Sequence, residues 1–102
     1  MQVTKHHCGK TKPDQWKDLS NGRGIYVDVD TSSCGFSPSK NIIYTTVLSG
    51  DNNHWATTGA TSLYKVTHKG FRIYIRWIDG GLLNAAFAEE REWHILWTGV
   101  QD

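Results

Sequence analysis

Two segments of the sequence combine a tryptophan with carboxylate, amide or imidazole side chains. They are Asp51 to Trp55 (Asp-Asn-Asn-His-Trp) and Trp77 to Gly80 (Trp-Ile-Asp-Gly). Sugar binding needs an apolar ring face for the C–H side of a pyranose and polar groups for its hydroxyls. Each segment follows a predicted strand, and the antiparallel strand order brings both strand ends to one end of the fold. The candidate sugar-binding residues are Asp51, Asn53, His54, Trp55, Trp77 and Asp79. The alternative is that both tryptophans lie in the core or a subunit interface and that the first segment is an ordinary turn.

A second candidate surface comes from the alternation of residues between Gly70 and Asp79. Side chains on a strand point to opposite faces with a period of two. One face carries Phe71, Ile73, Ile75 and Trp77, and the other carries Arg72, Tyr74 and Arg76. We expect the basic face to lie in an oligomer interface, paired with Asp28 and Asp30. The alternative is an acidic polymer or anionic sugar bound through Arg72 and Arg76, although two arginines are few for nucleic acid.

Other reactive side chains predict neither catalysis nor a cofactor. His6, His7 and Cys8 adjoin one another, but no second ligand pair has zinc spacing. Asp28 and Asp30 share a strand face without a third carboxylate nearby, so no metal is predicted. Cys34 with His68 or His94 lacks the local motif of a nucleophile and its base. No nucleophile elbow, phosphate loop or dinucleotide motif is present, and the protein is predicted not to be an enzyme.

The elements that must position these residues are mostly strands. Strands are predicted at 25–30, 41–49, 58–67, 70–79 and 92–100, and Val3 fits a further short strand. The continuous apolar run in 41–49 suits a strand covered on both faces or lying in a subunit interface. Residues 84–91 favour one or two helical turns, with Asn84 as the N-cap. Residues 1–24 are expected to be irregular, with Trp16 and Leu19 as anchors. The sequence therefore predicts an all-β fold, a six-stranded antiparallel β-sandwich in a single domain spanning 1–102.

Composition narrows the class of partner. The chain has 102 residues, including five tryptophans, four tyrosines and three phenylalanines, which is enough aromatic area for one core. Its net charge of +1 favours neither nucleic acid nor a membrane surface. Residues 1–6 contain no apolar segment typical of a signal peptide, so the sequence assigns no compartment. Cys8 and Cys34 are compatible with one disulfide, two free thiols or an intermolecular bridge.

From Tyr26 to Val100 the sequence resembles the H-type lectin domain of the snail agglutinins. The similarity rests on 27–38, on the Leu-Ser-Gly-Asp turn at 48–51, on the Thr-His-Lys-Gly-Phe segment at 67–71, and on Trp-x-x-x-Trp-x-Gly-Val at 93–100. The resemblance implies a trimer or a hexamer that binds galactose- or N-acetylgalactosamine-type glycans in clefts between protomers. It also implies a secreted protein. The family's sugar-binding Arg is missing from 57–67, and Ile78 follows Trp77 where the family has His.

The sequence thus predicts a non-catalytic carbohydrate-binding protein, a lectin that multiplies weak sites by assembling into a homotrimer or hexamer. No cofactor, nucleic acid or membrane is expected among its partners. The alternative prediction is a structural module that uses the sandwich for oligomerisation and binds no small ligand.

Overall fold

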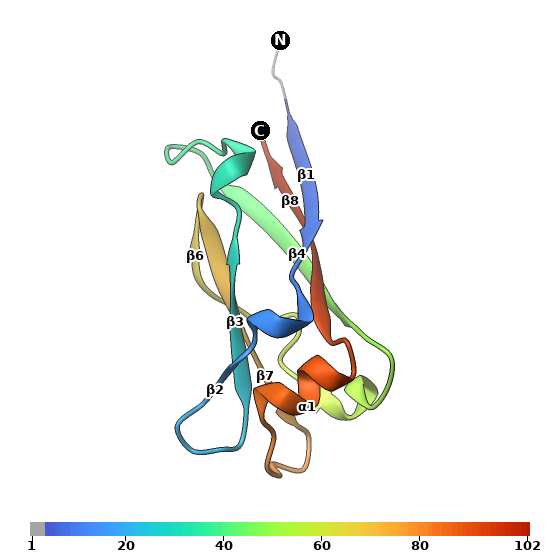
Figure 1. Ribbon diagram of the computed structural model, residues 1–102. Helices are drawn as coiled ribbons and strands as arrows, with labels where there is room; N and C mark the ends of the chain where they lie inside the picture. The colour runs from blue at the N-terminus through green and yellow to red at the C-terminus, as the bar shows by residue number, and fades with distance from the viewer. Residues whose placement is uncertain (1–3) are drawn as a thin grey trace.

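A computed structural model describes residues 4–102 as an elongated β-sandwich measuring 50 × 24 × 20 Å along its principal axes (Figure 1). One sheet has three strands in the order β1-β8-β4, and the other has the order β2-β3-β7-β5, with β6 also paired to β7. The strands are β1 (Lys5–Lys10), β2 (Lys17–Asp18), β3 (Ile25–Asp30), β4 (Ile42–Ser49), β5 (Thr57–Thr58), β6 (Leu63–Thr67), β7 (Gly70–Trp77) and β8 (His94–Gln101). All pairings within the sheets are antiparallel, so the predicted all-β antiparallel sandwich is confirmed. The described residues form eight strands rather than the predicted six, because β2 was not predicted and 58–67 divides into β5 and β6.

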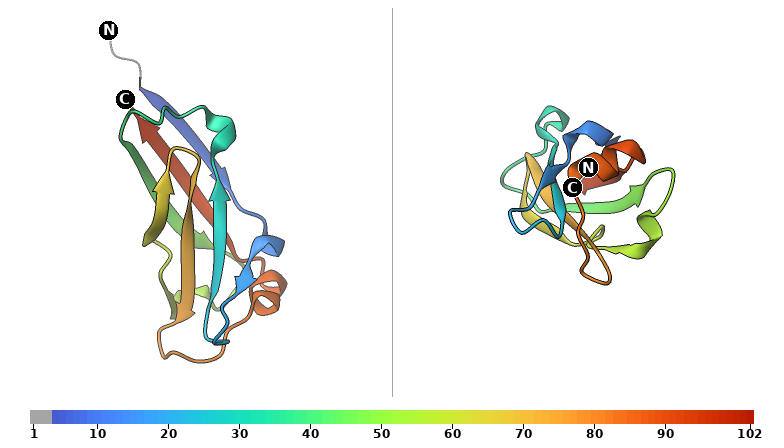
Figure 2. Two further views of the ribbon diagram at one scale, coloured as in Figure 1. Left: turned by 90° about the vertical axis from the view of Figure 1, so that its left-hand side faces the viewer. Right: turned by 60° about the horizontal axis from the view of Figure 1, so that its bottom comes forward.

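Strand β7 is the central strand of the larger sheet, as its alternation predicts. Its apolar residues Phe71, Ile73 and Ile75 are buried, and β3 pairs with it so that Ile25 lies opposite Ile75. Across the sandwich, three buried residues face this layer. They are Trp93, which directly precedes β8, and Ile95 and Trp97 of β8. Tyr44 of β4 joins the two layers, with its ring centroid 4.5 Å from that of Phe71. The two sheets and their long strands can be followed in Figure 2.

The prediction of a continuous strand over 58–67 is wrong. The structure has the two-residue β5, a turn in which the Ser62 amide donates to the Gly59 carbonyl, and then β6. Gly59 has φ = 111°, and a Cβ there would overlap the carbonyl oxygen of Tyr74. The chain therefore bends at Gly59 because it passes directly against β7, and the two halves pair with different parts of that strand.

The N-terminal segment is more regular than predicted. Lys5–Lys10 forms β1, which pairs along its whole length with β8, from Lys5 opposite Gln101 to Lys10 opposite Leu96. Its residues show no apolar alternation because the strand lies at an edge and its side chains are mostly exposed. Trp16 is buried as an anchor, as predicted, whereas Leu19 is half-buried. Val3 lies outside the described residues.

The helix prediction is confirmed, and its first turn is closed by the predicted cap. The helix α1 spans Ala85–Glu90, and the side chain of Asn84 accepts a 2.8 Å hydrogen bond from the Phe87 amide. Three short 3-10 turns complete the fold, at Pro13–Gln15, Ser32–Cys34 and His54–Ala56. The first and last of these turns lie near α1, in the half of the sandwich away from the two chain ends (Figure 1).

Candidate functional site

Three tyrosines form a row on the outward face of the larger sheet. The strand register puts Tyr26 of β3 directly opposite Tyr74 of β7, and their ring centroids are 5.8 Å apart. Tyr64 of β6 approaches Tyr74 from the other side, edge to face at 4.9 Å. Tyr64 keeps 51% of its surface exposed, so the row presents ring surface to solvent.

Arg72 is held within this row by a carboxylate of the same chain. Its Nε and one terminal nitrogen donate to the two carboxylate oxygens of Asp28, at 2.6 and 2.9 Å. The guanidinium carbon lies 4.3 Å from the centre of the Tyr26 ring, and a further nitrogen donates to the Tyr74 hydroxyl at 3.3 Å. The hydrogen bond from Arg72 lowers the pKa of Asp28 and raises that of the guanidinium. Arg72 is therefore a compensated charge that fixes the tyrosine rings.

Asp30, which was predicted to share this pairing, has another role. It lies opposite Gly70 in the register, and its carboxylate accepts a 2.9 Å hydrogen bond from the Ser32 amide. Hydrogen bonds from Ser32 lower the pKa of Asp30. Within the described residues its partner is thus the turn after β3 rather than an arginine of β7.

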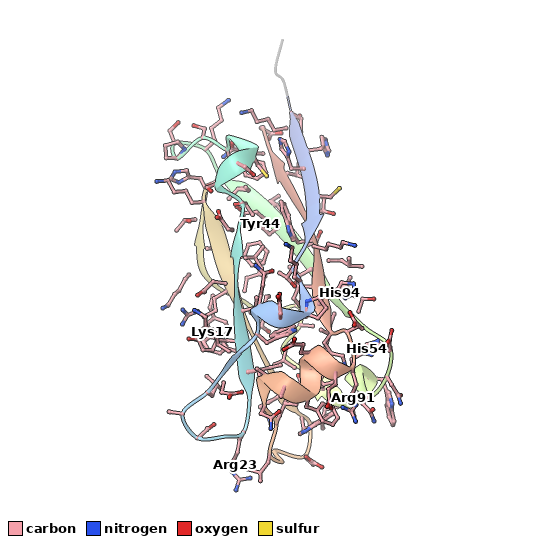
Figure 3. The ribbon with its side chains drawn as sticks, in the orientation of Figure 1. Lys17, Arg23, Tyr44, His54, Arg91 and His94 are labelled. Carbon is pink, nitrogen blue, oxygen red and sulfur yellow. The ribbon has the colours of Figure 1, made fainter. Side chains whose placement is uncertain are left out.

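Beside the tyrosine row the sheet is hollowed. The hollow, of about 610 Å³, lies between β7, the β5–β6 turn and the turn that precedes β3. We call it the β7 hollow, and its polar and aromatic lining residues are Asn21, Arg23, Thr58, Ser62, Tyr64, Tyr74 and Arg76. Thr58 lies directly opposite Arg76 in the register. Figure 3 shows Arg23 in the turn at the end of the molecule far from the chain ends. Two guanidinium groups, one amide, and the hydroxyl groups of serine, threonine and tyrosine side chains therefore surround one concave surface.

The residues predicted to bind sugar are brought to one end of the fold, but several are already engaged. Thr57 pairs with Trp77, and the Ile78 amide donates to the Ala56 carbonyl at 3.0 Å, so the two segments do adjoin. Trp77 contacts Phe87 and Trp93 edge to face, at 5.4 and 5.6 Å between ring centroids. Its indole nitrogen donates to the Leu82 carbonyl at 3.0 Å.

The other members of that predicted set divide between turn-forming and exposed positions. Asn53 accepts a 3.1 Å hydrogen bond from Nε of Arg91, and Asp79 accepts one of 2.8 Å from the Gly81 amide. The His54 ring lies edge to face with that of Trp93, with the ring centroids 6.5 Å apart, and its Nδ1 is buried without a hydrogen-bond partner among the described residues. Trp55 is 83% exposed, and Asp51 is also exposed. Trp55, Asp51 and Asp79 are therefore the exposed members of this set. A hydrogen bond from its amide to the Arg91 carbonyl explains the position of Asp51, and the bond from Gly81 explains that of Asp79.

Sequence reasoning missed Tyr26, Tyr64, Asn21 and Arg23 as site residues. Tyr26 and Tyr64 join Tyr74 only through the register of strands that are far apart in sequence, which no local pattern reveals. Arg23 lies in a turn that adjoins 80–83, where its guanidinium donates to the Gly80 carbonyl at 3.0 Å and the Leu83 amide donates to the Gly22 carbonyl at 3.1 Å. The one available signal was the tyrosine at an outward position of each of the three strands.

The possible metal and redox residues are separated or exposed. Among residues 4–102, no group of three or more His, Cys, Asp or Glu side chains is arranged to hold a metal ion. Both cysteines are free thiols, Cys8 exposed on β1 and Cys34 half-buried after β3. Burial and the nearby charge of Asp30 raise the pKa of the Cys34 thiol. The predicted alternative of one disulfide between Cys8 and Cys34 is therefore not what this structure has.

No family model matches the chain, and no curated protein matches it. Within the part of the chain that the structure describes, no helix combines the length and apolar character required to cross a membrane.

Proposed function

We propose that this protein is a non-catalytic carbohydrate-binding protein. The observation that carries the proposal is the β7 hollow, whose lining includes both the edge-to-face pair Tyr64 and Tyr74 and the two arginines Arg23 and Arg76. A pyranose has an apolar C–H face that packs on an aromatic ring, and hydroxyl groups that need directional hydrogen-bond partners. The hollow supplies both in a volume of about 610 Å³, within the range of small-molecule sites.

The lining of the β7 hollow favours binding over turnover. Its residues offer ring faces, guanidinium and amide donors, and hydroxyls, with no carboxylate, cysteine or histidine among them. Ser62 and Thr58 have hydroxyl groups that could act as nucleophiles, but no histidine or carboxylate lines the hollow to serve as their general base. The proposal is therefore of a lectin, with galactose and N-acetylgalactosamine as the first glycans to test because of the sequence resemblance to H-type lectins.

Weak single sites become useful when several are linked. We therefore extend the proposal to a homotrimer or hexamer that binds glycans by avidity. The predicted interface comprised Asp28, Asp30, Arg72, Tyr74 and Arg76. Because Arg72 has its carboxylate partner Asp28 within the chain, an interface there would use Arg76 and the tyrosine rings rather than new ion pairs to Arg72.

A glycan array probed with the folded protein tests the proposal, with light scattering to give the oligomeric state. We expect binding to galactose-type glycans, lost in Tyr64→Ala and kept in Trp55→Ala. Both residues are exposed aromatics, so the two variants are matched in chemistry. Loss in Trp55→Ala alone would place the site at the Asp51–Trp55 segment, as the sequence predicts. Silence across neutral and acidic glycans from a folded protein would show that the proposal is wrong.

A second candidate function, an oligomerisation module, is favoured by the outward face of the smaller sheet. Ile43 is 65% exposed, Val47 is 52% exposed and Leu96 is 38% exposed, on the adjacent strands β4 and β8. Among the described residues whose side chains point outward from β1, β8 and β4, only Lys10 belongs to the charged types Lys, Arg, Asp and Glu. The surface is shallow, with a hollow of about 510 Å³ over β8. An apolar face with few charges suits contact with a second copy of the chain.

Light scattering on Val47→Glu distinguishes this function from glycan binding. If the smaller sheet mediates self-association, this variant is monomeric, whereas Lys40→Glu, an exposed loop substitution, keeps the wild-type mass. A wild-type protein that is monomeric at micromolar concentration would show the second candidate to be wrong and would remove the oligomer from the first, while glycan binding by the single chain would still stand.

A further inference from the structure

The two arginines of the β7 hollow differ from Arg72 in having no carboxylate partner. Among residues 4–102, the ion pairs are Arg72 with Asp28 and Arg91 with Glu90. Arg23 instead donates to the Gly80 carbonyl at 3.0 Å, and Arg76 donates to the Trp77 carbonyl at 3.4 Å. These contacts to neutral oxygens use one donor on each guanidinium and leave its charge uncompensated.

The hollow itself contributes no negative charge. Its lining includes Arg23 and Arg76 but no Asp or Glu. Asp28, the nearest carboxylate in the tyrosine row, is bound on both oxygens by Arg72. A ligand in the hollow therefore meets two positive charges and no opposing carboxylate, which favours an anionic group over a neutral one.

The aromatic wall restricts what can carry that anion. Tyr64 and Tyr74 meet edge to face at 4.9 Å, so Tyr74 lies against one side of Tyr64 while half of the Tyr64 surface remains exposed. An inorganic anion alone would leave this ring surface unused. A ring with an apolar face and an attached sulfate or carboxylate would use both the rings and the guanidinium groups.

We infer that the β7 hollow binds an anionic glycan, one whose sugar ring packs on Tyr64 while its sulfate or carboxylate is held by Arg23 and Arg76. This inference rests on the proposed carbohydrate-binding function and specifies its substrate class. It also replaces the predicted pair of Arg72 and Arg76 with Arg23 and Arg76, because the charge of Arg72 is already compensated.

The test compares three immobilised glycans that share one type of ring: a neutral galactan tetrasaccharide, the same tetrasaccharide carrying sulfate, and a galacturonate tetrasaccharide. The sulfated and galacturonate forms are expected to bind at least about tenfold more tightly than the neutral one, since hydrogen bonds to charged groups are the stronger ones. Their affinity should fall as salt rises from about 50 to about 200 mM, while that of the neutral glycan changes little.

Three other results of this binding comparison would each lead to a different conclusion. Equal affinity for the neutral and anionic forms would overturn this inference and leave the proposed function standing. No binding to any of the three, together with silence on the wider array, would overturn both. A single-stranded polynucleotide that binds as tightly as the sulfated galactan would show a general polyanion surface and overturn the assignment to glycans.

Substitutions test whether the preference for anionic glycans comes from the arginines of the β7 hollow. Arg76→Gln and Arg23→Gln are each expected to reduce affinity for the sulfated galactan about tenfold, and to reduce affinity for the neutral galactan by a smaller factor, because glutamine keeps a hydrogen-bond donor but loses the charge. Arg76→Lys keeps the charge and should retain part of the affinity. Lys10→Gln and Lys40→Gln remove the same charge at exposed positions outside the hollow, so equal losses in these controls would overturn the inference. Unchanged far-ultraviolet circular dichroism and melting temperature show that each variant is folded.

Discussion

The indole nitrogen of Trp16 donates a 2.8 Å hydrogen bond to the carbonyl oxygen of Trp93, 77 positions further along the chain. Trp16 is 5% exposed and Trp93 is fully buried. The Trp93 indole in turn donates to the Asn52 carbonyl at 2.8 Å. Two tryptophans thus connect the N-terminal segment, the start of β8 and the Asp51–Trp55 segment at one end of the sandwich.

Trp16→Phe is expected to lower the free energy of unfolding by about 2–3 kcal/mol. The substitution keeps an aromatic ring but removes the donor, so the buried Trp93 carbonyl loses its partner and part of the indole volume is lost. Urea denaturation followed by circular dichroism gives the value. Trp55→Phe is the matched control, because that side chain is 83% exposed and its substitution should cost less than about 0.5 kcal/mol. Equal costs for the two variants would contradict the prediction.

Features set by neighbouring residues were predictable, and features set by distant ones were not. The alternation of β7 and the Asn84 cap are local patterns, and both predictions are confirmed. β1 has no such pattern, because backbone pairing with β8 defines it rather than apolar burial. The break after Thr58 depends on how closely Gly59 approaches the Tyr74 carbonyl.

The candidate site shows the same division. The outward positions of Arg72, Tyr74 and Arg76 follow from the alternation of β7 alone. Asp28 pairs with Arg72 rather than with Arg76 because of the β3–β7 register, and no local sequence pattern specifies that register. The β7 hollow also requires the turn at Asn21 and Arg23, whose placement beside Gly80 is a tertiary contact. Sequence reasoning therefore finds the face but not the residues with which it would bind a ligand.

Gly59→Ala is expected to destabilise the protein by about 2 kcal/mol or more. Its φ of 111° is unfavourable for any side chain, and the added Cβ would overlap the Tyr74 carbonyl oxygen. Gly80→Ala is the matched control, with φ of 77° and nothing within 4 Å of the new Cβ, so only the backbone strain of about 1 kcal/mol applies. Thermal denaturation of both variants measures the difference. If Gly80→Ala were the less stable of the two, the close approach of β5 to β7 would not be the cause.

Asp28→Asn is expected to lower stability at neutral pH by about 0.5–1 kcal/mol, the upper part of the range for exposed ion pairs, because the Arg72 contact is bidentate. The pKa of Asp28 is lower in the folded protein than its ordinary value of 3.8. Its contribution is therefore complete above that ordinary value and is lost as the pH falls through the lower folded value. Urea denaturation at a series of pH values should show the difference between wild type and variant at neutral pH and its loss well below about pH 4. Asp51→Asn is the control at an exposed aspartate without an ion pair in the described residues. A difference that persisted unchanged under acid conditions would mean that Asp28 acts through something other than its charge.

Alkylation by iodoacetamide should modify Cys8 before Cys34. The thiolate is the reactive form, and burial, together with the charge of Asp30, raises the pKa of Cys34 so that less thiolate is present at a given pH. Cys8 is exposed on β1, which also favours attack there. Mass spectrometry of Cys8→Ser and Cys34→Ser variants follows each thiol separately, and the same labelling in denaturant should remove the difference. Asp30→Asn is expected to speed the labelling of Cys34 modestly and to leave Cys8 unchanged, because it removes the negative charge that disfavours the Cys34 thiolate. Faster labelling of Cys34 than of Cys8 in the folded wild type would contradict this placement of the two thiols.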